Sequence, residues 1–205
     1  MKRTTFRYPK TKTGEKTFRR IIRHGKRLFA KHGYHSTSVN DIIAKSRIAS
    51  GTFYIYFDSK LALYLYLLDE YKHKIRQAST EATNDLDTRY EMEREGLKAF
   101  IMYAKKDPLS YKLIWESMFV NPDIFKEYYT SFGESYTRHL FPFVETGEVR
   151  EDIDLKNLSF MLMGIANFVG LEILFMDKTE ESDIDHVVDE TMKVLKNGMF
   201  RNKEE

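Results

Sequence analysis

Apolar side chains recur at three- and four-residue steps along most of the chain, and this spacing constrains the fold more than any other feature. Such steps place side chains on one face of an α-helix, whereas a half-buried strand requires strict alternation. No stretch of useful length alternates in this way, and the sequence contains no internal repeat or low-complexity tract. The sequence therefore predicts an all-α protein.

Local signals give the approximate limits of the expected helices. Asp107 with Pro108 and Asn121 with Pro122 each combine a capping side chain with a proline at the first helical position. Pro142 and Gly147 are expected to end the second of these helices. The expected helices cover about 15–31, 37–46, 49–57, 60–80, 88–105, 108–120, 122–141, 155–177 and 182–198, the last one opened by Ser182 and stopped by Gly198.

The charge of the chain is divided unevenly along its length. Residues 1–60 contain 15 Lys and Arg against 3 Asp and Glu, while the remainder contains 18 against 28, although the net charge of the whole is only +2. A positive segment of this kind is expected where a protein meets a phosphate backbone, although a solubilising basic tail is the alternative. Residues 1–14 are expected to form a mobile basic arm, which either contacts DNA or is disordered without a function.

Cysteine usage and the longest apolar run bear on where the protein works. The chain has no cysteine, so it has no disulfide or thiolate metal site, in agreement with a reducing cytoplasm. No apolar run follows the basic N-terminus, so no signal peptide is expected. The apolar run at 159–176 is long enough to span a membrane, but Asn167 and Glu172 would lie inside the bilayer. We therefore expect a buried helix and a cytoplasmic protein.

The stretch from Thr37 to Lys60 predicts two short helices joined by a tight turn. Thr37 or Ser38 can cap the first helix, and Asp41 stands three residues after Ser38, as in a capping box. The second helix is expected to begin at Ala49 or Ser50. Its Gly51 would let the backbone approach another molecule closely, and its tyrosine hydroxyls could reach a phosphate.

This stretch resembles the N-terminal signature of the TetR family of transcriptional repressors. The resemblance is carried by residues at fixed offsets, namely Thr37, Asp41, Ile42, Ile48, Gly51, Thr52, Tyr54, Tyr56, Phe57 and Lys60. It implies contacts to the DNA backbone from Thr37, Gly51, Tyr54, Tyr56 and Lys60, and base contacts from Ser50, Thr52 and Ile55. Four positions depart from the family: Ile43 and Ser46 stand where alanine is usual, Arg47 stands where glycine is usual, and Ala49 stands where serine would cap the second helix.

The resemblance also implies a domain organisation and a set of partners. A helix-turn-helix domain at 15–60 is followed by a larger helical domain at 61–205 that binds a small molecule and forms a homodimer. The expected partners are a double-stranded DNA operator, a small-molecule effector and a second copy of the chain. No membrane, metal or cofactor is expected.

Aromatic residues at helical spacing in the second half suggest where an effector could bind. Such a stripe is usual in a protein core, but together with a carboxylate it also suits a pocket for a bulky, partly apolar ligand. The predicted ligand-binding residues are Tyr111, Trp115, Glu116, Phe119, Phe132 and Phe168.

Two other classes of function are compatible with parts of the sequence. An enzyme could use Glu116, Glu172 or His139 as acid or base, but the chain has no nucleophile elbow, phosphate-binding glycine loop or HExxH motif. A DNA-architectural protein without a ligand would explain only the basic segment. His32 and His35 lack a third ligand nearby in sequence and do not suggest a metal site. We therefore expect a regulator with no catalytic residue.

Overall fold

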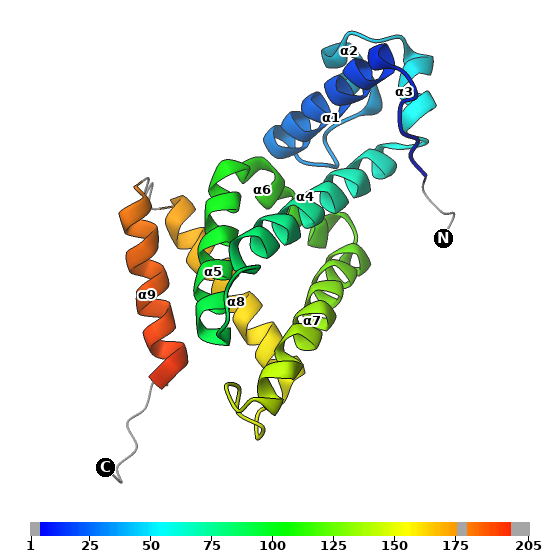
Figure 1. The fold of residues 1–205 in the computed structure, drawn as a ribbon. Coiled ribbons are helices and arrows are strands. Elements are labelled where there is room, and N and C mark those ends of the chain that lie inside the picture. The colour runs from blue at the N-terminus through cyan, green and yellow to red at the C-terminus, as the bar shows by residue number, and fades with distance from the viewer. Residues whose placement is uncertain (1–4, 176–179, 198–205) are drawn as a thin grey trace. The chain divides into compact units, whose positions relative to one another are not determined.

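The computed structural model describes residues 5–175 and 180–197, and the regular elements in this part of the chain are α-helices (Figure 1). The all-α prediction is therefore confirmed. The helices, in chain order, are α1 (Lys12–His32), α2 (Val39–Ser46), α3 (Ser50–Tyr56), α4 (Lys60–Thr83), α5 (Arg89–Lys106), α6 (Pro108–Val120), α7 (Pro122–Glu145), α8 (Leu155–Phe175) and α9 (Glu181–Asn197).

The chain divides into two compact units, which differ from the expected division at residue 60. The N-terminal unit comprises Met1–Lys74 and Asp107–Glu127, and the C-terminal unit comprises Ile75–Lys106 and Tyr128–Glu205. Thus α1, α2, α3 and α6 belong to the first unit, while α5, α8 and α9 belong to the second. Helices α4 and α7 contribute to both. The spacing of apolar residues did not predict that α6 belongs to the N-terminal unit. Such spacing shows that a helix has a buried face, but not which helix covers that face.

An aromatic cluster forms part of the core of the N-terminal unit. Phe18 of α1 stacks on Phe57, with ring centroids 5.2 Å apart, and meets the edges of Tyr56 and Tyr66 at 5.4 and 5.3 Å. All four residues are buried. The cluster joins α1, the end of α3 and α4, so the recognition segment is held by side chains that are distant in sequence.

The segment Thr5–Thr11 differs from the expected mobile arm, because it is attached to the N-terminal unit. The backbone N–H and Oγ1 of Thr5 both donate to Asp58 Oδ2 at 3.0 Å, and the N–H of Arg7 donates to the carbonyl of Tyr56 at 2.8 Å. Phe6 forms an isolated β-bridge with Phe57. The prediction of a mobile arm rested on charge content alone. The segment also contains the apolar Phe6, and this explains why it packs against the N-terminal unit. Residues 1–4 lie outside the described part.

Several helix limits confirm the expected caps, and others correct them. Asp107 accepts the N–H of Ser110 at the start of α6, as expected, and Ser59 Oγ caps α4 by accepting the N–H of Ala62 at 3.1 Å. Helix α1 begins at Lys12 rather than near residue 15, because Thr11 Oγ1 accepts the N–H of Gly14.

Proline ends α7 less abruptly than expected. Pro142 lies inside α7, which continues to Glu145. A proline inside a helix lacks an N–H donor and its ring crowds the carbonyl four residues earlier, but both effects stay within one turn, here close to the end of a long helix. The reversal follows at Gly147, whose φ is 79°. Helix α9 starts at Glu181, one residue before the expected Ser182, and the expected stop at Gly198 lies outside the described residues.

The C-terminal unit has its own core, formed by α5, α8 and α9. Its buried members are Leu97, Ile101, Ile173, Ile184, Val188 and Met192. Within the described residues, Leu155–Leu174 is the one stretch long and apolar enough to cross a membrane, and only 22% of it is buried within the chain. The core helix of a protein in water can have the same length and composition, and α8 packs against α5.

Lys60, the first residue of α4, ties that helix to the connection between α1 and α2. Its Nζ donates to the carbonyls of Tyr34 and Thr37, each at 2.8 Å, and lies 4.2 Å from the centre of the Tyr34 ring. Desolvation by burial lowers the pKa of Lys60 from its ordinary value. The ammonium thus satisfies two carbonyls that follow the end of α1.

We expect Lys60→Met to lower the free energy of unfolding by about 1–2 kcal/mol, because it leaves both carbonyls without their donor. Urea denaturation at neutral pH, followed by circular dichroism, measures this change. Lys45→Met is the matched control, since Lys45 is exposed on α2 and should leave the midpoint unchanged. A wild-type midpoint for Lys60→Met would show that these hydrogen bonds do not stabilise the unit.

Candidate nucleic-acid interface

Helix α2 starts with the capping box that the sequence predicts. Ser38 is the N-cap: its Oγ accepts the N–H of Asp41 at 3.1 Å, and Asp41 Oδ2 accepts the N–H of Ser38 at 2.8 Å. These hydrogen bonds from Ser38 hold the pKa of Asp41 below its ordinary value. The alternative start at Thr37 is excluded by this geometry.

The turn after α2 contains two of the departures from the family pattern, Arg47 and Ala49, and each has a structural cost. Arg47 is left-handed, with φ 50° and ψ 55°, a conformation that costs a non-glycine residue about 1–2 kcal/mol. Glycine at this position would avoid that strain. Ala49 is the N-cap of α3 and makes no side-chain cap hydrogen bond, as expected. The missing cap costs about 1 kcal/mol, so α3 depends on tertiary packing.

Helix α3 buries one face and exposes the face expected to read DNA. Phe53 and Phe57 are fully buried, whereas Tyr54 and Ile55 are 51% and 56% exposed. Ser50 and Gly51 are exposed as well, and Thr52 is half-buried. A Cβ on Gly51 would have no atom of this chain within 4 Å, so the space beside its backbone is open to another molecule. Most of the predicted contact residues thus share one accessible surface.

Three predicted backbone contacts are more enclosed than the rest. Thr37 is only 2% exposed, and its Oγ1 donates to the carbonyl of Gly33 at 2.8 Å. The Lys60 ammonium is bonded to carbonyls of this chain, as described above. The ring of Tyr56 is buried against Phe18. Sequence position could not separate these residues from exposed Tyr54, because burial depends on partners elsewhere in the chain. Their contact with DNA stays a prediction.

Helix α6 is bonded to α1 at successive turns, which the sequence did not indicate. Lys26 Nζ donates to Asp107 Oδ2 at 2.8 Å, and Lys112 Nζ donates to the carbonyl of Ala30 at 2.7 Å. One turn further, Glu116 Oε1 accepts the N–H of Tyr34 at 2.5 Å. Burial alone would raise the pKa of Asp107, but the hydrogen bonds from Lys26 and Ser110 keep it below its ordinary value. The N–H of Tyr34, just past α1, is thus held by a carboxylate of α6.

The predicted ligand-binding residues are divided between the two units. Tyr111, Trp115, Glu116 and Phe119 lie on α6 in the N-terminal unit, whereas Phe132 and Phe168 belong to the C-terminal unit. Trp115 lies between Tyr111 and Phe125, with ring centroids 6.4 and 6.5 Å away. Phe119 and Phe168 are 73% and 68% exposed. A common binding pocket for the six stays a prediction.

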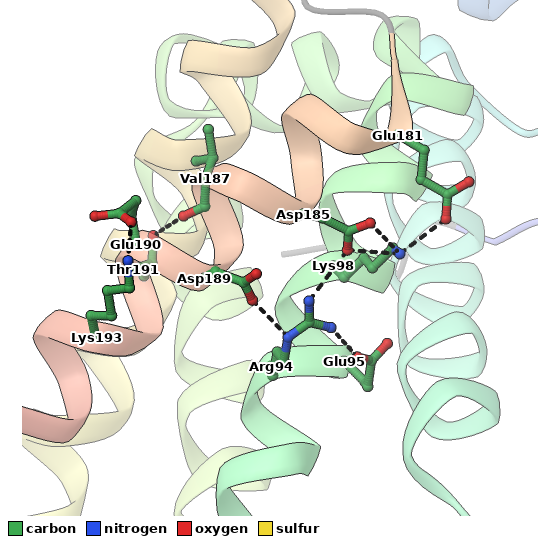
Figure 2. A network of polar contacts seen from close by, with 10 residues as sticks. All are labelled: Arg94, Glu95, Lys98, Glu181, Asp185, Val187, Asp189, Glu190, Thr191 and Lys193. Atoms are coloured by element: carbon green, nitrogen blue, oxygen red, sulfur yellow. Dashed lines mark hydrogen bonds and ion pairs between the residues drawn. The ribbon is translucent and has the colours of Figure 1, made fainter.

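Within the C-terminal unit, charged side chains tie α9 to α5 (Figure 2). Lys98 Nζ lies 2.8 Å from Asp185 Oδ1 and 2.9 Å from Glu181 Oε1, and Arg94 Nε donates to Asp189 Oδ1 at 2.8 Å. The hydrogen bond from Lys98 lowers the pKa of Asp185. Partly exposed ion pairs of this kind are individually weak, so we assign them an orienting role: they turn one side of α9 towards α5.

Three of the residues considered for catalysis or metal binding, Glu116, His139 and His35, have structural partners. Glu116 holds the Tyr34 N–H, and His139 Nδ1 lies 2.7 Å from the carbonyl of Ser135 in its own helix. His35 Nε2 lies 3.2 Å from the carbonyl of Phe119. In the described part of the chain, no group of three His, Cys, Asp or Glu residues could hold a metal ion.

Sequence comparison places the helix-turn-helix segment in a known family. The family described as "Bacterial regulatory proteins, tetR family" matches residues 21–67. YuxN of Bacillus subtilis (strain 168), described as an uncharacterized HTH-type transcriptional regulator, is 50% identical over 54 residues. That match covers 26% of this chain and 19% of YuxN, so the chain spans about a fifth of that relative's length.

Structural comparison extends the likeness over nearly the whole chain. The fatty acid degradation regulator FadR from Bacillus halodurans superposes with a TM-score of 0.78 at 18% identity, covering 95% of this chain and 100% of that one. The transcriptional regulator FadR from Bacillus subtilis, in complex with stearoyl-CoA, gives 0.74 at 17% identity, covering 89% and 100%. At these identities the likeness shows the fold. The chain therefore carries a TetR-family helix-turn-helix segment at residues 21–67, on a fold that it shares with solved transcriptional regulators.

Proposed function

We propose that this protein is a cytoplasmic, dimeric, DNA-binding transcriptional regulator whose affinity for its operator falls when an amphipathic small molecule binds. The observation that carries the proposal is the capped helix pair α2 and α3, which presents Ser50, Gly51, Tyr54 and Ile55 on an accessible surface of a basic segment. Among such regulators we favour a repressor, which leaves its operator when the small molecule binds.

Different residues of this surface have different roles in the proposed complex. Ser50, Thr52 and Ile55 would contact base edges in the major groove, where hydrogen bonds and apolar contacts specify sequence. Gly51 and Tyr54, with Thr37, Tyr56 and Lys60, would contact the phosphate backbone, which sets position but not sequence. The exposed cations of the unit would supply the electrostatic part of the affinity.

We expect specific duplex binding that weakens steeply as salt rises, because the basic segment displaces counterions from several phosphates. The measurement is fluorescence anisotropy with an operator selected from random duplexes by the wild type, between about 50 and 200 mM salt. Ser50→Ala and Thr52→Ala should change the preferred sequence, whereas Lys45→Ala should weaken all duplexes alike. Binding that is independent of salt and sequence would contradict the proposal.

The proposed dimer rests on the apolar side chains that α8 leaves uncovered. Phe160, Met161 and Phe168 are 41%, 65% and 68% exposed, and Val194 of α9 is 55% exposed. Large apolar side chains left exposed on one helix often mark a protein contact, and a helix-turn-helix needs a second copy to bind two half-sites. Gly170 and Val188 are buried within the single chain, so they are unsuitable places to test the dimer.

We expect a stable dimer at micromolar concentration, and we expect Met161→Arg to weaken it at least about a hundredfold, because a buried unpaired charge costs about 3–5 kcal/mol. Equilibrium sedimentation measures both. Phe141→Arg on α7 is the control, since Phe141 is 57% exposed and belongs to neither α8 nor α9. Wild-type protein that sediments as a monomer would exclude this dimer.

The proposed effector is a long-chain acyl compound such as a fatty acyl-CoA. Support comes from the fold shared with a FadR that was solved with stearoyl-CoA, and from the aromatic residues of α6 and α7. A route for coupling is also present: α4 runs without a break from Lys60 to Thr83 and contributes to both units. In a dimer, the two copies of α3 must lie about 34 Å apart to enter successive major grooves. A small change in the distance between them would therefore weaken operator binding.

We expect an acyl-CoA to change the fluorescence of Trp115, the single tryptophan, and to release a labelled operator over the same concentration range. Linkage requires DNA to weaken ligand binding by the same factor. Titration of stearoyl-CoA with and without operator measures this reciprocity, and free CoA is the control for the acyl chain. Saturation of the protein by the acyl-CoA with no change in operator affinity would refute the coupling.

A further inference from the structure

Arg76 of α4 lies partly buried in the C-terminal unit and has no acidic partner there. Its Nη2 donates to the carbonyl of Ser131 on α7 at 3.1 Å, and its guanidinium carbon lies 4.7 Å from the centre of the Phe132 ring. Within residues 5–175 and 180–197 it makes no ion pair with a carboxylate. Buried cations are normally paired, so this guanidinium calls for an explanation.

The sequence around Arg76 explains why its own helix leaves it uncompensated. In an α-helix, residues three and four positions away are neighbours, and an acid at one of them can form an ion pair. Lys74 of the same helix is paired in this way with Glu70, at 3.0 Å. None of the corresponding neighbours of Arg76 is acidic: they are Lys72, His73, Ser79 and Thr80.

A second arginine on the same side of α7 is neutralised, in contrast to Arg76. The guanidinium carbon of Arg89 lies 5.4 Å from the centre of the Tyr136 ring, and Arg89 forms an ion pair with Glu93. Tyr136 follows Phe132 by one helical turn, so the two guanidinium groups lie at successive turns of α7. Two positive charges therefore meet one carboxylate, and one positive charge is left over.

Part of the Arg76 guanidinium is open to a ligand. Its Nε is enclosed, whereas its Nη1 is accessible to solvent and makes no hydrogen bond within the described residues. Phe132, one of the predicted ligand-binding residues, lies against it, and the Tyr128 ring lies 5.1 Å from that of Phe132. An uncompensated cation beside aromatic rings suits an anionic group attached to an apolar body.

We propose that Arg76 binds the anionic head group of the effector and that Tyr128 and Phe132 contact the adjoining apolar part. The free N–H groups of Arg76 donate to carboxylate or phosphate oxygens, which the planar guanidinium matches well, and the anion supplies the missing acidic partner. The inference rests on the proposed function and deepens it, because it names the charge of the effector and the residue that selects it. A free fatty acid and an acyl-CoA both present such oxygens, and the experiment separates them.

The first test compares dodecanoate, dodecanoyl-CoA and dodecanol, which share an alkyl chain and differ in charge. Titration calorimetry in the absence of DNA gives the Kd of each for wild type and Arg76→Met. The variant should bind one or both anions at least about tenfold more weakly, because a hydrogen bond to a charged group is lost, and should bind dodecanol as wild type does. Arg138→Met is the matched control, since Arg138 is an exposed cation on α7 and should leave all three affinities unchanged.

The pattern of losses identifies the source of the anion. A loss for dodecanoate alone assigns the carboxylate of a fatty acid, and a loss for dodecanoyl-CoA alone assigns the phosphates of CoA. Equal losses for both anions show a site that accepts either group. An equal loss for dodecanol as well would show that Arg76 only supports the fold, and it would overturn the proposal. Unchanged affinity for both anions would overturn it too.

The second test removes the charge but keeps a donor. Arg76→Gln retains an N–H group that can reach the carbonyl of Ser131, so its urea midpoint should equal that of wild type. Its affinity for the preferred anion, relative to dodecanol, should nevertheless fall as far as that of Arg76→Met. This ratio would not move if Arg76 only tied α4 to α7. A folded Arg76→Gln protein with an undiminished ratio would therefore exclude Arg76 as the head-group residue.

Failure of this inference can be told apart from failure of the proposed function. If dodecanoyl-CoA releases a labelled operator equally from wild type and Arg76→Met, the proposed regulator stands, but Arg76 does not bind the head group of its effector. If wild type binds duplex DNA but none of the three probes, the proposed effector class fails, and this inference fails with it.

Discussion

The accessible face of α3 depends on the burial of its opposite face against the aromatic cluster around Phe18. Helix α3 has 7 residues and no side-chain cap, so it would not be stable in isolation. Phe53 and Phe57 are fully buried, and Phe18 stacks on Phe57. Because this burial fixes the rotation of α3 about its axis, Tyr54 and Ile55 face outwards. The same cluster receives Phe6, so the N-terminal segment is held by the packing that orients the recognition helix.

The place of α6 changes how an effector would act. The sequence suggested that α6 belongs to a separate ligand-binding domain, but its side chains bond to α1 and to the residue that follows it. Glu116, expected to orient an effector, accepts the N–H of Tyr34, and the neighbouring carbonyl of Tyr34 accepts the Lys60 ammonium. A ligand that moved α6 would therefore act on the end of α1 directly, in addition to any effect through α4.

Features that depend on neighbours in sequence were predicted well. The capping box of Ser38 and Asp41, the start of α6 at Asp107 and the uncapped Ala49 involve residues within a few positions of one another. Features that depend on distant partners were missed. Charge content suggested a mobile arm at residues that are docked through Phe6 and Thr5, and a family pattern did not show that Thr37 is enclosed.

The sequence by itself determined that the chain is helical, roughly where its helices begin, and that its N-terminal part carries a helix-turn-helix, because periodicity, caps and turn residues act over a few positions. The tertiary structure alone decided which of the predicted contact residues are accessible, that α6 packs with the DNA-binding helices, and that Glu116 accepts the N–H of Tyr34. These outcomes depend on which buried faces meet, and residues far apart in sequence, such as Tyr34 and Glu116, are brought together only when the apolar surfaces around them are removed from water.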